Sequence, residues 1–254
     1  MQFVSTMTIA LAIAGPAAAA ATPALPVPAG VKNVVIVPDA FVDGSSWRLV
    51  HDILWLKGYK VSIVQPSHTT LDDDVAATRK VLFDQVGPVV LVGHGIGGSA
   101  ISIAGAGDKV KALVYVAALQ PAVGENARQL NASMPPASNS LRTNWLGTSY
   151  FDPARYHADL AADLPQNRTN IMAASQVPIT QATLNAASWG DAWRDKPSYA
   201  VVATEDRYLN PDLQRWMYKR AGAKVTEVKA SHAVYISKPH EVANVIEQAA
   251  LNAR

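Results

Sequence analysis

Polar residues in this chain gather at points where a buried strand is expected to end. The segments are DAFVDGSSW (39–47), GHGIGG (93–98), TEDRYLNP (204–211) and SHAVYISKP (231–239). They hold aspartates, histidines and a glycine-rich turn, which acid–base and nucleophilic catalysis use. The turn has the spacing of a G-x-S-x-G bend, in which the serine is a nucleophile between a strand and a helix. Its middle residue here is Gly95, which cannot attack a carbonyl.

The elements that would position these segments alternate between strand and helix. Short apolar runs rich in β-branched residues predict buried strands at 34–38, 60–66, 88–93, 111–119, 199–204 and 224–230. Amphipathic segments predict helices at 46–58, 71–87, 98–107, 210–222 and 239–254. This alternation predicts an α/β fold with a mostly parallel central sheet and helices on both faces. Such sheets bind ligands at the carboxyl ends of their strands, where the polar segments lie.

One part of the chain breaks the alternation. Residues from about 120 to 196 show no convincing buried strand, contain several prolines and include helical fragments such as 153–164. A loop of that length without structure of its own would be unusual in a compact domain. We therefore expect a mainly helical cap insertion over the carboxyl edge of the sheet.

The amino-terminal residues differ in composition from the rest of the chain. An apolar run leads into alanines with several A-x-A-like cleavage sites, which predicts a signal peptide at 1–21, a linker at 22–31 and one domain at 32–254. The apolar run is too short for stable membrane insertion. We expect export to the periplasm or beyond, and a disordered low-complexity tail is the alternative.

The composition of the chain limits the kinds of molecule that it is expected to bind. With 49% hydrophobic and 17% charged residues and a formal net charge of +2, the chain predicts a soluble domain that acts on a small molecule and not on nucleic acid. Cysteine is absent, and no ligand spacing indicates a metal or another cofactor. The glycines at 93, 95 and 98 also fit a dinucleotide-binding turn, but this turn follows the third predicted strand and no acidic residue stands at the required distance.

Four stretches of the chain together resemble a known family. VPDAFVDGSSW, LVGHGIGGSAI, VATEDRYLNP and ASHAVYISKP resemble, in order and spacing, the α/β-hydrolase family. The chain is most similar to small bacterial esterase-like members with a G-H-S-x-G-G elbow, and the likeness runs through nearly the whole chain after residue 31. The resemblance implies the chain order nucleophile, acid, histidine.

Carried over position by position, the resemblance implies a triad of the nucleophile position Gly95, the acid Asp206 and the base His232. It implies oxyanion-hole amides at Ile96 and Ala40. It also implies that Phe41 and Trp47 wall the substrate pocket. Glu205 is the rival for the acid.

Two positions depart from the family pattern. Glycine at 95 should preserve the bend while removing covalent catalysis. The family usually has His-Gly or Pro-Gly before the oxyanion loop, where this chain has Pro38-Asp39. If Asp39 points inward it would oppose an oxyanion and raise the basicity of His232, and if it points outward it would do nothing.

Two hypotheses follow. The chain is either a hydrolase of carboxylic esters or related acyl compounds whose nucleophile has been replaced, or a diverged relative. The diverged relative would bind a ligand or act as a cofactor-free general-base catalyst through His232–Asp206. The first hypothesis predicts that Gly95→Ser gives turnover of short-chain aryl esters that His232→Ala abolishes.

The remaining candidates have simpler interpretations. His94 is expected to pack structurally beside the bend. The aspartates at 72–74 are expected to stabilise a helix N-terminus. Surface or helix positions are expected for the other histidines, which are His51, His68, His157 and His240.

Overall fold

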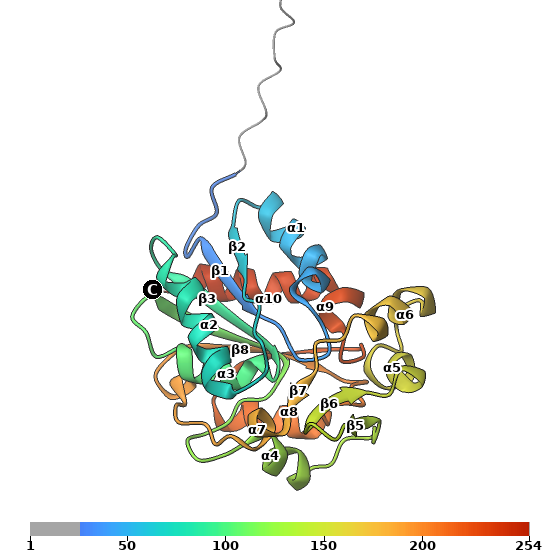
Figure 1. The fold of residues 1–254 in the computed structure, drawn as a ribbon. Coiled ribbons are helices and arrows are strands. Elements are labelled where there is room, and N and C mark those ends of the chain that lie inside the picture. Colours follow the sequence, from blue (N-terminus) through green and yellow to red (C-terminus); the bar gives the residue numbers. More distant parts are fainter. Residues whose placement is uncertain (1–25, 254) are drawn as a thin grey trace, which may run out of the picture.

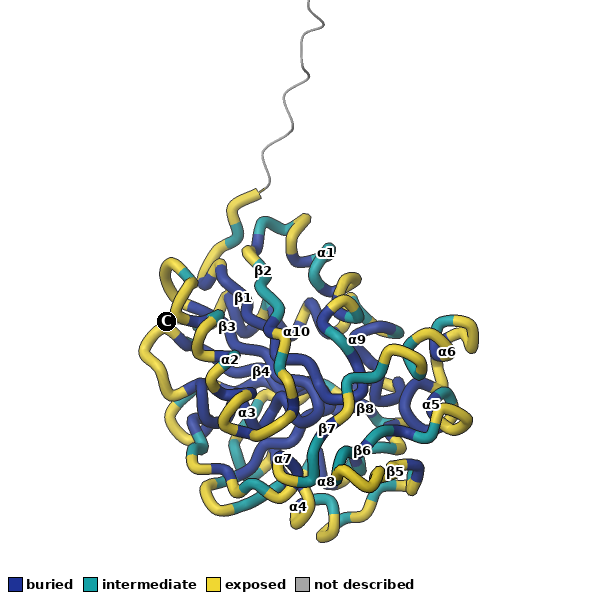
Figure 2. Tube along the Cα trace, in the orientation of Figure 1, coloured by how far each residue is buried: buried dark blue, intermediate teal, exposed yellow. Residues whose placement is uncertain are grey.

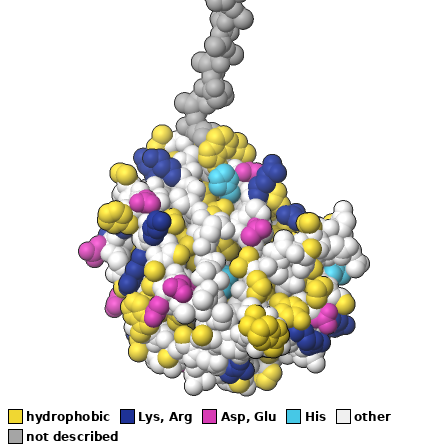
Figure 3. Space-filling view, in the orientation of Figure 1, with side chains coloured by type: hydrophobic (Ala, Val, Ile, Leu, Met, Phe, Trp, Pro, Cys, Tyr) yellow, Lys and Arg dark blue, Asp and Glu magenta, His cyan; other side chains and the backbone are white. Residues whose placement is uncertain are grey.

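The computed structural model describes residues 26–253. The predicted signal peptide at 1–21 and the first part of the predicted linker lie outside these residues. Within the described part of the chain, no helix combines the length and apolarity that crossing a membrane would need. Figure 3 shows Lys and Arg side chains interspersed with Asp and Glu on the face drawn.

A parallel sheet of six strands forms the centre of the molecule (Figure 1), in the spatial order β2-β1-β3-β4-β8-β9. The bounds are Asn33–Val37 for β1, Lys60–Ile63 for β2, Val89–Gly95 for β3, Val110–Ala118 for β4, Ser198–Ala203 for β8 and Lys224–Val228 for β9. Every neighbouring pair runs parallel. The four central strands are almost wholly buried (Figure 2), as continuous β-branched runs predict for strands covered on both faces.

Helices cover both faces of this sheet. Val34 and Val90 pack with α1 and α10 on one face, while Val35 and Leu91 pack with α2, α3 and α8 on the other. This division follows from the alternation of side chains along a strand. The bounds are Arg48–Leu56 for α1, Leu71–Phe83 for α2, Gly97–Ala104 for α3, Pro211–Arg220 for α8, Val234–Ser237 for α9 and Pro239–Asn252 for α10, and a 3₁₀ helix η1 spans Gly44–Trp47.

The segment between β4 and β8 forms the cap, and it is mainly helical as expected. Its helices are α4 (Ala127–Ser133), α5 (Pro153–Leu160), α6 (Gln166–Ala174), α7 (Gln181–Asn185) and the 3₁₀ helix η2 (Ala192–Arg194). It also contains a small antiparallel sheet of β5 (Leu141–Thr143), β6 (Thr148–Phe151) and β7 (Ile179–Thr180), which the sequence pattern does not predict. These strands have two to four residues, too few for a readable period.

Candidate active site

The glycine-rich turn joins β3 to α3 through a sharp bend at Gly95. The φ angle of Gly95 is +52°, a left-handed conformation that side-chain-bearing residues rarely adopt. Ile96 already has helical angles, and α3 begins at Gly97. Gly98 allows the helix to approach the chain after β4, because a Cβ there would lie 1.9 Å from the carbonyl oxygen of Leu119. The bend is therefore the strand–turn–helix feature that the sequence predicts.

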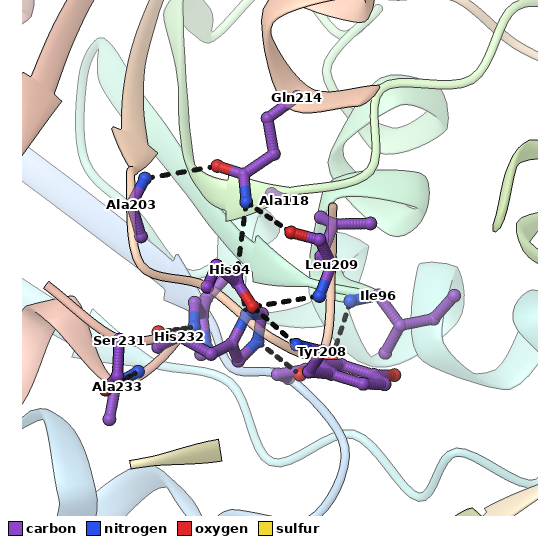
Figure 4. Close-up of polar contacts among 12 residues, drawn as sticks. His94, Ile96, Ala118, Ala203, Tyr208, Leu209, Gln214, Ser231, His232 and Ala233 are labelled. Atoms are coloured by element: carbon purple, nitrogen blue, oxygen red, sulfur yellow. Dashed lines mark hydrogen bonds and ion pairs between the residues drawn. The ribbon is translucent and has the colours of Figure 1, made fainter. Parts of the chain in front are cut away.

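The loops after β8 and β9 bring Asp206 and His232 together. The Nδ1 atom of His232 lies 2.6 Å from Oδ2 of Asp206. Backbone amides of Tyr208 and Leu209 each donate to Oδ1 of Asp206 at 2.8 Å, and the side chain of Gln214 donates to Oδ2 at 2.9 Å (Figure 4). A carboxylate that accepts hydrogen bonds from so many donors is fixed in place.

Asp39, two residues beyond β1, points inward. Its Oδ2 atom lies 3.0 Å from Nε2 of His232, and its Oδ1 atom accepts a 2.6 Å hydrogen bond from the backbone amide of Ile96. The side chains of Asp39 and His232 are each 1% exposed. The question that the sequence leaves open is therefore answered: Asp39 faces His232, which stands between two carboxylates.

Asp39 fills the space that a side chain at position 95 would need. A Cβ atom built on Gly95 would lie 2.0 Å from Cγ of Asp39 and 2.1 and 2.3 Å from its two carboxylate oxygens. The two departures from the family pattern are thus coupled, because an aspartate in this orientation requires a glycine at 95. This also changes the expectation for Gly95→Ser, since the new side chain would collide with Asp39.

The two carboxylates determine the protonation of His232. Burial alone would lower the pKa of His232, but the charges of Asp206 and Asp39 and their hydrogen bonds outweigh it and raise that pKa to about 10. Burial alone would raise the pKa of Asp39, yet its hydrogen bond to His232, followed by the His232 charge, lowers it. At neutral pH the site therefore holds an imidazolium between two carboxylates.

Of the two amides that the resemblance implies for an oxyanion hole, those of Ile96 and Ala40, one is already engaged. The Ile96 amide binds Asp39, and Ala40 is buried next to Asp39 in the loop after β1. A substrate oxyanion would have to displace the carboxylate of Asp39 to reach the Ile96 amide. The same carboxylate would repel it.

His94 lies directly beside this cluster. Its ring centroid is 4.5 Å from that of His232, and its Nε2 atom lies 3.1 Å from the backbone oxygen of His232. Burial, and then the charge of His232, lower the pKa of His94 to about 3, so the ring is neutral. Nδ1 of His94 is buried without a hydrogen-bond partner in the described structure. Within residues 26–253, Asp39, His94 and His232 form the one cluster whose ligand atoms, all within 4.8 Å of one another, could hold a metal ion.

Aromatic rings separate the cluster from a cavity under the cap. The ring of Tyr208 lies 4.9 Å from that of His232, and Phe151 and Phe41 pack edge-on against Tyr208. Tyr208 and Phe151 also line a cavity of about 670 Å³ between α4, β5, β6 and α7. The volume is within the range of small-molecule sites. Phe41 contacts Tyr208, which lines the cavity, but is not itself among the lining residues. Trp47 stacks on Tyr235 in the core beside His94 and does not line the cavity either.

Other candidates from the sequence occupy different places. Glu205 is exposed and lies 3.6 Å from Lys229, so it is not the partner of His232. The expectation for His68 is wrong, because His68 is buried and its Nδ1 lies 2.8 Å from Asp74. Asp74 belongs to the first turn of α2, as expected. Its carboxylate also accepts a hydrogen bond from the backbone amide of His68 and contacts Nδ1 of the His68 ring.

Gln214 and Tyr208 are the site residues that sequence reasoning missed. Gln214 bridges the amide of Ala203 at the end of β8 and the carboxylate of Asp206 (Figure 4). A buried glutamine on the inner face of a helix after the acid loop is a weak pattern, and only its position one turn into α8 could have indicated it. Tyr208 lies in the TEDRYLNP segment, two residues past Asp206, where its aromatic character gives no specific indication.

Comparison with known proteins agrees with this fold. The rice (Oryza sativa subsp. japonica) esterase PIR7B is 28% identical over 185 residues, which cover 62% of this chain and 68% of that protein. Among solved structures, polyneuridine aldehyde esterase superposes with a TM-score of 0.74 at 19% identity, covering 86% of this chain and 98% of that one. Tomato methylketone synthase I, solved with 2-tridecanone, gives 0.76 at 17% identity, covering 88% and 99%. At these identities the structural likenesses establish the fold.

The family itself is established by sequence. Residues 34–245 match the model of the alpha/beta hydrolase family, a span that runs from β1 into α10 and includes every residue of the cluster. The chain belongs to the alpha/beta hydrolase family, among relatives that include esterases.

Proposed function

We propose that this chain is an acid–base catalyst that acts on a small organic substrate through Asp39, His232 and Asp206 without an acyl-enzyme intermediate. The observation that carries the proposal is the position of Asp39. Its carboxylate lies over Gly95, against Nε2 of His232 and against the Ile96 amide, and so occupies the place of a nucleophile.

Acyl transfer is disfavoured at this site for two reasons. Gly95 supplies no nucleophile, and the oxyanion donor Ile96 is bound to a carboxylate that would repel a developing negative charge. The neighbouring Ser102 is no substitute, because its hydroxyl bonds to the Gly98 carbonyl and to the Tyr115 hydroxyl within the core.

Proton transfer suits the same groups. His232 carries a proton on Nε2, and Asp39 beside it is an ionised carboxylate. A carbonyl substrate that enters between them would accept a hydrogen bond from Nε2 of His232 at its oxygen. Asp39 would then take a proton from the adjacent carbon, which leaves an enolate whose oxygen is stabilised by the hydrogen bond from Nε2 of His232. Separating the pair also removes the interaction that lowers the pKa of Asp39, and so makes that carboxylate a better base.

The lining of the cap cavity supports the choice of substrate class. Its lining combines amide, hydroxyl and guanidinium groups with Leu141, Leu184 and the Phe151 and Tyr208 rings. This suits a small molecule with an apolar body and a few polar atoms. Methylketone synthase I has been solved with 2-tridecanone and, as a histidine variant, with β-ketoheptanoate. Ketones and β-keto acids are therefore the first compounds to test on this chain.

Direct hydrolysis of an ester by water is a second candidate. It is favoured by the intact His232–Asp206 pair and by the rice esterase among the relatives. It would require Asp39 to leave the Ile96 amide so that the amide can bind the oxyanion.

Deuterium exchange at the α-carbon of methyl ketones, followed by proton NMR in D₂O, tests the first proposal. We expect exchange by the unaltered protein and a fall of about 10²–10⁴-fold in Asp39→Asn and in His232→Gln, the usual contribution of a positioned acid or base. Asp52→Asn, an exposed aspartate with a histidine neighbour, is the matched control. Hydrolysis of aryl esters with an initial burst, or exchange that survives Asp39→Asn, would contradict it.

A further inference from the structure

We propose that Asp39, His94 and His232 form a binding site for one divalent transition-metal cation, best matched by Zn²⁺. This goes beyond the proposed function, which concerns the proton shared by Asp39 and His232. The sequence does not predict this site, because the three residues are 55 or more positions apart and show no ligand spacing.

The donor set and its spacing fit such an ion. One atom from each residue lies within 4.8 Å of the others, and all three residues are buried. Two imidazoles and a carboxylate are donors that zinc prefers, and three protein ligands with a fourth position open is the arrangement of catalytic zinc sites. Ligands bound at about 2.0–2.1 Å in a tetrahedral site lie about 3.3 Å apart. The Asp39 and His232 atoms, 3.0 Å apart, already have nearly that spacing, and His94 would have to approach them by at most about 1.5 Å.

Each of the three proposed ligand residues also makes a hydrogen bond through its second polar atom, which fixes the orientation of the side chain. Nδ1 of His232 bonds to Asp206, Nε2 of His94 to the backbone oxygen of His232, and Oδ1 of Asp39 to the amide of Ile96. Metal-binding histidines almost always donate their second ring nitrogen to a carboxylate or a backbone carbonyl, which orients the ring. Both histidines here show that pattern.

His94 supplies the observation that hydrogen bonding within the cluster does not explain. Because Nε2 donates to a backbone carbonyl oxygen, Nδ1 is the ring nitrogen left to act as an acceptor or a ligand. That nitrogen is buried and has no hydrogen-bond partner in the described structure. A buried polar atom without a partner destabilises the folded protein, and a metal bond would satisfy it.

The charges of the cluster also favour a divalent cation. Two carboxylates and one imidazolium leave a net charge of −1 in a buried site. A divalent cation that replaces the Nε2 proton of His232 would bring the net charge to zero. Burying a neutral set of charges costs far less than burying an excess one.

Zinc binding to the chelator-treated full-length protein tests the proposal. Titration calorimetry at pH 8 should show one Zn²⁺ per chain. The stoichiometry is checked by elemental analysis after dialysis.

Variants locate the site. We expect His94→Gln and Asp39→Asn each to weaken zinc binding at least 10-fold, and Asp206→Asn, which would not touch the metal, to weaken it by about 10–100-fold through His232. His240→Gln on an exposed histidine is the control and should bind as the unaltered chain does. If the variants fail to fold, Co²⁺ added to the unaltered protein should give the intense visible bands of a tetrahedral nitrogen–oxygen site.

Zinc that does not bind, or that binds equally to His94→Gln, would overturn the proposal. Its failure is separate from that of the proposed function. Ketone exchange is measured after treatment with a chelator, so it reports Asp39 and His232 without any metal.

Discussion

The contact between Gly95 and Asp39 predicts that a single methyl group at position 95 costs more stability while Asp39 is present than after Asp39 is removed. In Gly95→Ala the new Cβ would lie 2.0 Å from Cγ of Asp39, well inside van der Waals contact. Asp39 cannot move aside freely, because its two oxygens bond to the Ile96 amide and to His232. In Asp39→Ala all three of the colliding atoms are gone.

The expected loss of stability in Gly95→Ala has two parts. An alanine forced into the left-handed conformation of Gly95 loses about 1–2 kcal/mol of stability. Forcing extra volume into a packed site costs about 1–3 kcal/mol more. We therefore expect Gly95→Ala to lower the free energy of unfolding by about 2–5 kcal/mol in the unaltered chain, but by only about 1–2 kcal/mol in Asp39→Ala, where the backbone cost remains.

Urea unfolding of the four proteins in this double-mutant cycle measures the difference. The coupling energy should be about 1–3 kcal/mol, since residues in contact do not add independently. Gly222→Ala is the matched control, because Gly222 has a φ of +62° and nothing within 4 Å of a built Cβ. Gly222→Ala should therefore lose only the stability that a left-handed backbone costs an alanine. Effects of Gly95→Ala that are equal in both backgrounds would refute the coupling of the two positions.

Three further predictions concern the charges, the ring over the site and the amino terminus. Because the folded pKa of His232, about 10, exceeds its ordinary 6.5, its stabilising contribution is complete below pH 6.5 and is lost as the pH rises to about 10. Urea unfolding should show a decline over that window of on the order of 5 kcal/mol at most, and Asp39→Asn should shrink it. Tyr208→Ala should lower the free energy of unfolding by about 2–4 kcal/mol through loss of ring contacts with His232 and Phe151, while Tyr208→Phe, which keeps the ring, should not. Export, which we retain as a proposal, predicts that protein recovered from the periplasm begins near residue 22 on amino-terminal sequencing, and an intact Met1 there would contradict it.

The sheet and the placement of the catalytic loops could be predicted because strong local patterns specify them. Runs such as VVIV and VVLV are continuous and β-branched, which fits strands buried on both faces, and they became β1 and β3. In parallel sheets the carboxyl ends of strands share one edge. The loops that hold Asp206 and His232 therefore had to meet beside the bend at Gly95, and the pair lies at 2.6 Å.

The orientation of Asp39 could not be predicted, because it depends on contacts with residues far away in the sequence. Whether the side chain turns inward is decided by the space over Gly95 and by the donors on Ile96 and His232. The pairing of His68 with Asp74 was missed for a similar reason. His68 has a φ of +53°, and this turn, which no local pattern indicates, directs its ring to the first turn of α2.

The protonation state of His232 is the most direct test of the arrangement at this site. In ¹⁵N-labelled protein, the ring nitrogens of His232, assigned by comparison with His232→Gln, report by NMR whether each carries a proton. With carboxylates on both sides, both nitrogens should remain protonated at pH 8 and titrate only near pH 10. A ring that is neutral at pH 8 and titrates near 6.5 would mean that Asp39 does not face His232, and would contradict the acid–base pair on which the proposed function depends.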